Sequence, residues 1–141
     1  MLDPFEINEG CTALLTTTLY DETDTPIPYA DLLSLTLHLY DQATDLASPG
    51  STTAVLNGRN RSDILSSTSS GASAGPKDGG IVYDTGFVSI TLSSSDNDMK
   101  DTDKYVERHV ALLEWSYGSS DSPSWGREEF LLDIQNMNQV T

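Results

Sequence analysis

The sequence has few of the residues that staple small folds or bind polyanions. A single cysteine, Cys11, occurs in 141 residues, which excludes an intrachain disulfide and any zinc site built from several cysteines. Only 7 Lys and Arg oppose 22 Asp and Glu, so the net charge is −15. That charge repels phosphate backbones and anionic membrane surfaces. We therefore expect no direct nucleic-acid or membrane partner, and an acidic surface that either maintains solubility or docks on a basic partner.

Long apolar runs are also missing from the chain. No stretch approaches the roughly 20 apolar residues that a membrane-spanning helix needs. Residues 1–6 contain neither a basic region nor an apolar core, so we expect no signal peptide. The length of 141 residues fits one domain, residues 1–141, that can bury a core without covalent staples.

Strict alternation of apolar and polar residues dominates residues 33–41, Leu-Ser-Leu-Thr-Leu-His-Leu-Tyr-Asp. The leucines at 33, 35, 37 and 39 are expected on one face of a β-strand, with His38 and Tyr40 on the other. Four leucines left in water would forfeit about 6–12 kcal/mol of burial, so a second sheet must cover them. The alternation predicts a two-layer β-protein built around an interior strand.

Shorter alternating segments predict the rest of the sheets. A short strand at 55–58 leads into an Asn-Gly turn, residues 62–65 are predicted as a capped helical turn, and 41–53 and 118–126 are predicted as loops. Roughly seven to eight strands with almost no amphipathic helix predict an all-β fold, an antiparallel immunoglobulin-like β-sandwich. A jelly roll is the alternative. The other expected strands are 5–7, 11–20, 81–83, 87–92, 105–117 and 127–134.

Residues 66–80 form a low-complexity segment that is rich in Ser and Gly and has no large apolar side chain. Such a segment cannot bury a core, so we expect a flexible loop or arm. It is either an inert surface insertion or a segment that orders on a neighbour. On the second interpretation, Ser70, Gly71 and Lys77 are candidate partner contacts.

Residues 96–107 form the densest acidic cluster. Asp96, Asp98 and Glu107 stand at the first, third and twelfth positions of a calcium loop. Lys100 stands where a ligand is needed, and Asp101 where the loop needs glycine. We interpret the segment as a solvated acidic turn, with calcium binding as the alternative.

The histidines and the cysteine form no recognisable catalytic motif. His38 and His109 both fall in the middle of predicted strands and could meet across a sheet to bind a metal, although polar-face and interface roles are commoner. Cys11 is expected to be an inert buried thiol on an apolar strand face. Neither a nucleophile elbow nor a Gly-rich phosphate loop occurs. We therefore expect a protein that is not an enzyme and uses no metal or cofactor.

Aromatic residues flank the last predicted loop. Trp115 is expected in the core, whereas Trp125 is either an ordinary surface residue or a partner contact. An exposed indole at a loop can fill a pocket on a partner protein or stack on a sugar ring. A carbohydrate-binding or adhesion module is therefore one functional hypothesis.

Three segments carry a resemblance to a known family: residues 27–41 (IPYADLLSLTLHLYD), 56–60 (LNGRN) and 106–115 (VERHVALLEW). They resemble the small virion proteins of tailed bacteriophages. The general plan is also similar to the immunoglobulin-like N-terminal domain of phage baseplate upper proteins. The resemblance implies a non-enzymatic virion component, made in the host cytoplasm, that contacts other virion proteins in many copies within a symmetric assembly. It favours capsid decoration or head-to-tail connection, with a tail or baseplate component as the alternative, and the insertion at 66–80 departs from the family.

Overall fold

The computed structural model describes residues 4–57, 59, 62–63, 73–74, 81–84 and 86–137. Within these ranges the chain is mostly β, as predicted, with nine strands, one short α-helix and three 3₁₀ turns. The strands are β1 (Phe5–Asn8), β2 (Ala13–Thr18), β3 (Leu32–Asp41), β4 (Ser62–Asp63), β5 (Ser73–Ala74), β6 (Ile81–Asp84), β7 (Phe87–Leu92), β8 (Val106–Ser119) and β9 (Ser122–Gln135). The helix is α1 (Gln42–Ala47), and the turns are η1 (Tyr29–Asp31), η2 (Thr52–Ala54) and η3 (Ser95–Asn97).

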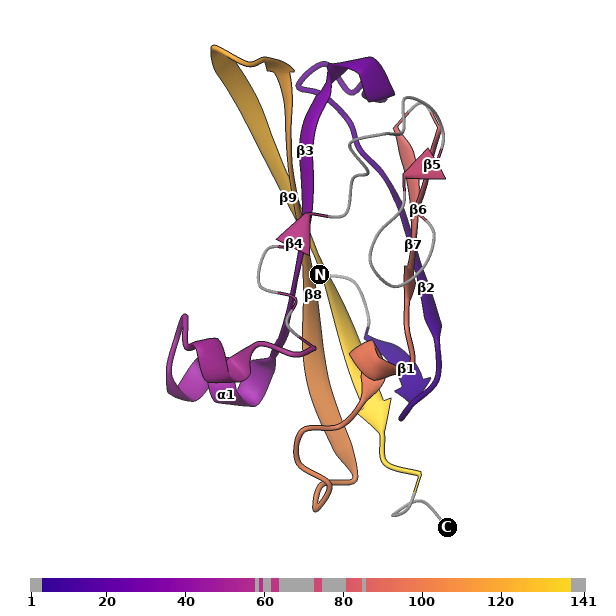
Figure 1. Cartoon of the computed structure of the whole chain (residues 1–141), viewed down its shortest axis with the longest axis vertical. Helices are drawn as coiled ribbons and strands as arrows, with labels where there is room; N and C mark the ends of the chain where they lie inside the picture. Colours follow the sequence, from indigo (N-terminus) through magenta and orange to yellow (C-terminus); the bar gives the residue numbers. More distant parts are fainter. Residues whose placement is uncertain are drawn as a thin grey trace.

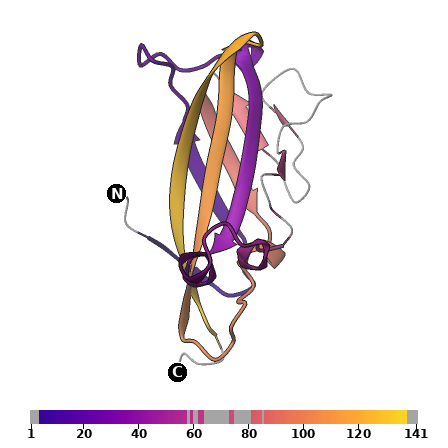
Figure 2. The ribbon, with the colours of Figure 1, turned by 90° about the vertical axis from the view of Figure 1, so that its left-hand side faces the viewer.

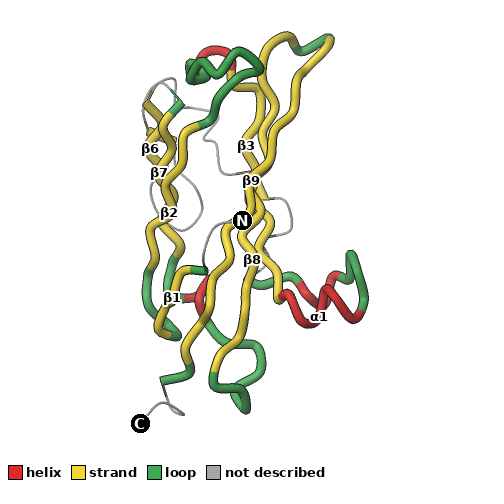
Figure 3. The backbone as a smooth tube through the Cα atoms, turned by 180° about the vertical axis from the view of Figure 1, so that it is seen from behind, coloured by secondary structure: helices red, strands yellow, loops and turns green. Residues whose placement is uncertain are grey.

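The strands form two sheets that face each other (Figures 1 and 2). The large sheet has the order β1-β9-β8-β3-β4, and the small sheet has the order β2-β7-β6-β5. The pairing of β1 with β9 is parallel, and all other pairings are antiparallel. Figure 3 shows α1 projecting from the side of the large sheet that faces away from the small sheet.

The core lies between the two sheets and is built from alternate residues of their longest strands. Leu35, Leu37 and Leu39 of β3 are at most 1% exposed, and the residues that cover them include Val88, Ile90 and Leu92 of β7. β3 lies between β8 and β4, which confirms the prediction of an interior strand. The cover of Leu35 to Leu39 by a second sheet is what the alternation requires.

The prediction that Leu33 shares the core face is wrong. The register of β3 against β8 shifts between Leu32 and Ser34, and such an irregularity moves the side chains on one side of it to the other face. Leu32 is therefore buried, and Leu33 is 42% exposed.

The last hairpin is longer than the sequence predicts. Residues 118–126 were expected to be a loop, but β8 continues to Ser119 and β9 begins at Ser122, so only residues 120 and 121 form the turn. Gly118 pairs with Pro123 and adopts a positive φ of 94°. Ladder hydrogen bonds between backbones need no apolar side chains, so the polar composition of this segment concealed its strands.

Three local predictions also need correction. Ser62 and Asp63 pair with β3 as β4 and do not form a helical turn, because the register places them beside Leu37 and Thr36. The expected loop at 41–53 contains α1, because the Asp41 carboxylate accepts hydrogen bonds from Ala43 N (3.3 Å) and Thr44 Oγ1 (2.8 Å) and so caps the helix. Residues 55–58 were expected to form a strand, but Val55 makes only an isolated bridge.

The N-terminal strand region also differs from expectation. β2 begins at Ala13, and Cys11 precedes it as an exposed residue, so the prediction of a buried thiol is wrong.

Within the Ser/Gly segment 66–80, Ser73–Ala74 forms β5 and pairs with β6. The remaining residues of that segment, with the candidate contacts Ser70, Gly71 and Lys77, lie outside the described residues.

Candidate interaction surface

The face of the large sheet that turns away from the small sheet is formed by alternate residues of β3, β8 and β9. We call it the outer face. These residues alternate with core residues such as Leu37 and Leu113 along each strand, so they point away from the core. Strand register arranges them in rows: Ser34, Ser116 and Trp125; Thr36, Glu114 and Arg127; His38, Leu112 and Glu129; Tyr40, Val110 and Leu131.

Trp125 is the most exposed aromatic residue of the outer face. Its side chain is 69% exposed, beside Arg127, whose Nη2 donates to Glu114 Oε2 at 3.1 Å. A hollow of about 350 Å³ is lined by Trp125, Gly126 and the same ion pair. Trp125 lies in a strand opposite Ser116 of β8 and not in a loop, so strand pairing fixes the position of its backbone. The exposure of Trp125 is now established, and its role as a partner contact stays a prediction.

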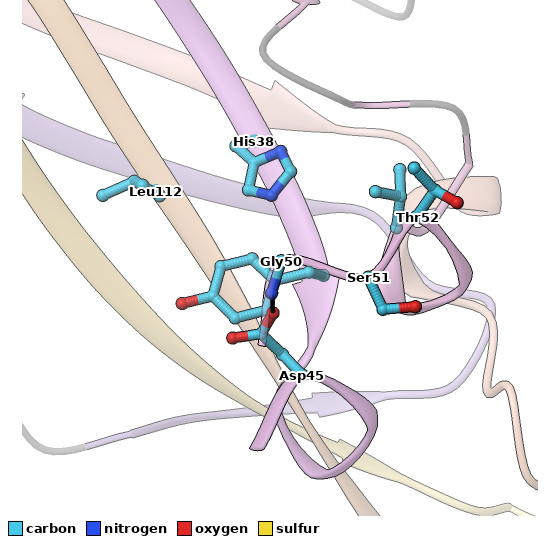
Figure 4. Close-up of a pocket in the computed structure, with 8 residues that line it drawn as sticks. His38, Asp45, Gly50, Ser51, Thr52 and Leu112 are labelled. Carbon is cyan, nitrogen blue, oxygen red and sulfur yellow. Dashed lines mark hydrogen bonds between the residues drawn. The ribbon is translucent and has the colours of Figure 1, made fainter. Parts of the chain in front are cut away.

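A second hollow of about 300 Å³ lies on the outer face between β3 and α1 (Figure 4). His38 and Tyr40 of β3 line it, with their ring centroids 5.2 Å apart. Asp45 of α1 closes one side and accepts a hydrogen bond from Gly50 N at 2.9 Å. The hydroxyl-bearing residues Ser51 and Thr52, together with Val55 and Leu112, complete the lining.

The electrostatics of this hollow are negative. Partial burial raises the pKa of the Tyr40 phenol, and the charges of Glu129 and Asp45 raise it further, while Arg127 acts weakly in the opposite direction. A phenol near carboxylates resists ionisation, because a second negative charge there would be repelled. Asp45 is the acidic residue among those that line the hollow, so a group bound there would face one carboxylate.

The acidic segment 96–107 contains two buried carboxylates with structural roles. Asp96 is fully buried in η3 and accepts hydrogen bonds from Arg59 Nε (3.1 Å), Asn57 Nδ2 (2.8 Å) and Ser93 N (2.9 Å). Burial opposes ionisation of the Asp96 carboxyl, but these hydrogen bonds outweigh it and hold its pKa below the ordinary value. The backbone oxygen of Arg59 also accepts from Leu39 N of β3, so the cluster joins one end of the two sheets.

Glu107 is the second buried carboxylate. It is 1% exposed and accepts hydrogen bonds from the backbone nitrogens of Lys100 and Asp101, both at 2.7 Å. His109 Nε2 lies 2.6 Å from its Oε1. Burial opposes ionisation of Glu107, but the hydrogen bonds from His109 and the two amides lower its pKa. By accepting these two backbone hydrogen bonds, Glu107 of β8 holds the acidic segment against the start of this strand.

These contacts correct the interpretation of residues 96–107 as a solvated turn, because Asp96 and Glu107 are interior residues with their own partners. Among the residues that the structure describes, no group of three His, Cys, Asp or Glu side chains could hold a metal ion. The alternative in which His38 and His109 meet across a sheet is wrong. His38 lines the outer hollow, whereas His109 is fully buried on the core side of β8.

Some of these features had no local signal in the sequence. Arg59 lies 37 positions from Asp96, so only the folded chain reveals that they pair.

Comparisons with protein-family models, with curated proteins and with solved structures found no match to this chain. In the part of the chain that the structure describes, no helix has the length and apolar character to cross a membrane.

Proposed function

We propose that this chain is a non-enzymatic structural component of a tailed-bacteriophage virion, which assembles through contacts with other virion proteins in many copies. The single observation that favours assembly is Trp125, a residue that is 69% exposed on a paired strand of the outer face. Exposed aromatic anchors on rigid elements are the groups that dominate binding energy at protein interfaces. The assignment to a virion comes from the resemblance of residues 27–41, 56–60 and 106–115.

An immunoglobulin-like plan is the finer description of the fold that we favour. In that plan one sheet holds strands C, F and G and the other holds strands B, E and D. The neighbours β3, β8 and β9 follow the first order, and β2, β7 and β6 follow the second. Of the nine described strands, β4 and β5 have two residues each, which leaves 9 − 2 = 7 longer strands.

Within a particle we favour capsid decoration or head-to-tail connection, with a tail or baseplate position as the alternative. The net charge of −15 supports docking on a basic surface. The Asp45 carboxylate, which lines the hollow beside Tyr40, is consistent with docking on such a surface.

Incorporation into particles tests this function. The chain should be detected by mass spectrometry in purified particles of the phage that encodes it, and its absence from them would refute the proposal. A phage that lacks the gene for this chain can then be complemented with a gene for the Trp125→Ser variant or for the Tyr105→Ser variant. We expect Trp125→Ser to reduce incorporation about tenfold or more, because truncating an interface anchor costs at least about 2 kcal/mol. Tyr105, which is 66% exposed and precedes β8, is the matched control and should have no effect.

A carbohydrate-binding or adhesion module is the second candidate function. The hollow beside His38, Tyr40 and Asp45 favours it, because ring faces beside a carboxylate and hydroxyl groups are the chemistry that binds sugars. Binding to a glycan array that is lost in Tyr40→Ala and retained in Trp125→Ser would support this function. Absence of binding to any glycan would refute it.

A further inference from the structure

The free edge of β2 differs from the other sheet edges within the described residues. β4 and β5, at two of the borders, have two residues each, and β1 is a four-residue strand that contains Glu6 and follows Pro4. Residues 122–131 of β9 extend beyond β1 and contain Pro123 and the charged run Arg127 to Glu129. Short strands, charges and proline are the usual means of protecting an edge from further pairing. β2 has six residues, Ala-Leu-Leu-Thr-Thr-Thr, and none of these features.

The backbone of β2 is regular and is paired on one side only. Its register with β7 runs without a shift from Ala13 opposite Leu92 to Thr18 opposite Phe87, and no described residue pairs with its other side. β2 lies at one border of the small sheet in Figure 2. The Thr17 hydroxyl donates to the Glu128 carboxylate of β9, which fixes β2 to the large sheet. β2 is therefore held in place, and the backbone N–H and C=O groups on its side away from β7 are available for pairing with another strand.

A groove lies between β1 and the first half of β2. It has a volume of about 330 Å³ and is lined by residues 5–8 of β1 and by residues 11–15. Two apolar side chains lie beside it, Phe5 at 45% exposed and Leu14 at 61% exposed. An added strand could therefore bury apolar side chains while it pairs with the backbone of β2.

The charges around β2 identify the kind of strand that fits. The strand itself is uncharged, but Glu6 and Glu9 precede it, and Asp21 and Glu22 follow it. An antiparallel pairing of two copies of β2 would bring the acidic residues at opposite ends together, and like charges across strands are destabilising. A partner strand with basic residues at both ends would instead pair with these carboxylates.

We propose that the free edge of β2 accepts an extended segment of a partner protein by strand addition, with an apolar residue beside Leu14 and Lys or Arg residues at its ends. Main-chain hydrogen bonds supply affinity in this recognition mode, and side-chain pockets supply specificity. This surface is separate from Trp125 and the outer face. Its test therefore stands apart from the test of the proposed function.

The probe is a synthetic peptide of alternating threonine and valine with one central leucine and two lysines at each end. It is titrated into the full chain, and amide chemical shifts and amide hydrogen exchange are followed by NMR. We expect chemical-shift changes confined to residues 5–22, and slower exchange of the β2 backbone amides that do not pair with β7. Exchange rates in β2 that stay unchanged at a saturating or millimolar peptide concentration would overturn the proposal.

Two comparisons separate strand addition from unspecific attraction. Leu14→Lys places a like charge beside the peptide and should weaken binding about tenfold or more, whereas Leu46→Lys, at a residue of α1 that is 74% exposed, should not. A peptide with glutamates in place of lysines should also bind about tenfold or more weakly. Equal binding in either comparison would overturn the proposal. A dimer of the wild-type chain that Leu14→Lys abolishes would also overturn it, because a second copy of the chain would then occupy the edge of β2. If Leu14→Lys unfolds at a lower temperature than the wild type, Thr16→Lys replaces it.

Discussion

Arg59 and Asp96 form an ion pair in the interior, with Nε 3.1 Å from Oδ1 and with side chains only 4% and 0% exposed. Removing one partner of a buried pair leaves the other charge uncompensated. We therefore predict that Asp96→Asn lowers the free energy of unfolding by about 3–5 kcal/mol. Urea denaturation followed by tryptophan fluorescence measures this change.

Asp133→Asn is the matched control for Asp96→Asn. Arg108 Nε donates to Asp133 Oδ1 at 2.7 Å, but these side chains are 41% and 19% exposed. Solvent screening limits such surface pairs to about 0–1 kcal/mol. Similar losses in the two variants would show that burial does not set the strength of the Arg59–Asp96 pair.

Acid should destabilise the fold through Asp96 and Glu107. The pKa values of both carboxyls in the folded chain are lowered from ordinary values of 3.8 and 4.5. At pH values near these ordinary values, the unfolded chain therefore binds more protons than the folded chain. Their contribution is complete above about pH 5 and is lost as the pH falls through the lowered values. We expect unfolding free energies measured between about pH 6 and about pH 3 to fall toward the acid end. The decline should be shallower in Glu107→Gln, and an equally steep decline in this variant would contradict the role of Glu107.

The irregularity in β3 makes two neighbouring leucines unequal. Leu35 is fully buried, whereas Leu33 is 42% exposed. We predict that Leu35→Ala destabilises the chain by about 2–5 kcal/mol, because it leaves a cavity in the core. Leu33→Ala should change stability by roughly 0.5 kcal/mol or less. Equal effects in chemical denaturation would mean that the register does not shift between Leu32 and Ser34.

Gly126 is required by the position of Trp115. A Cβ atom at residue 126 would lie 2.4 Å from Cε2 of the Trp115 indole, so the ring would have to move. We predict that Gly126→Ala costs about 1–3 kcal/mol of stability. The effect should shrink when Trp115 is replaced by Phe, because the smaller ring vacates space. A double-mutant cycle that shows no coupling would contradict direct contact between the two positions.

Periodicity predicted the strands that bury apolar side chains. Leu35, Leu37 and Leu39 alternate with polar residues, and so do Val88, Ile90 and Leu92, and both sets lie in the core. Trp115 was predicted to be buried and is 7% exposed. The signal fails where pairing depends on the backbone alone, which is why the extension of the hairpin through Gly118 and Pro123 was not anticipated.

Surface features and buried charges were less predictable than the strands. Trp125 was a candidate contact from its residue type and its place at an expected loop, whereas its exposure depends on the strand register that places it opposite Ser116. The acidic residues Asp96 and Glu107 looked solvated, because their partners come from Arg59 and from backbone amides that only the fold brings near. The helix after β3 did have a signal, the capping residue Asp41.

A cryo-electron microscopy reconstruction of the purified particle tests the assembly role most directly. We expect the two-sheet fold at many symmetry-related positions, with Trp125 and the outer face packed against a neighbouring virion protein. A reconstruction in which the outer face borders solvent would contradict the role of Trp125. A particle that contains no copy of the chain would contradict its assignment as a virion component.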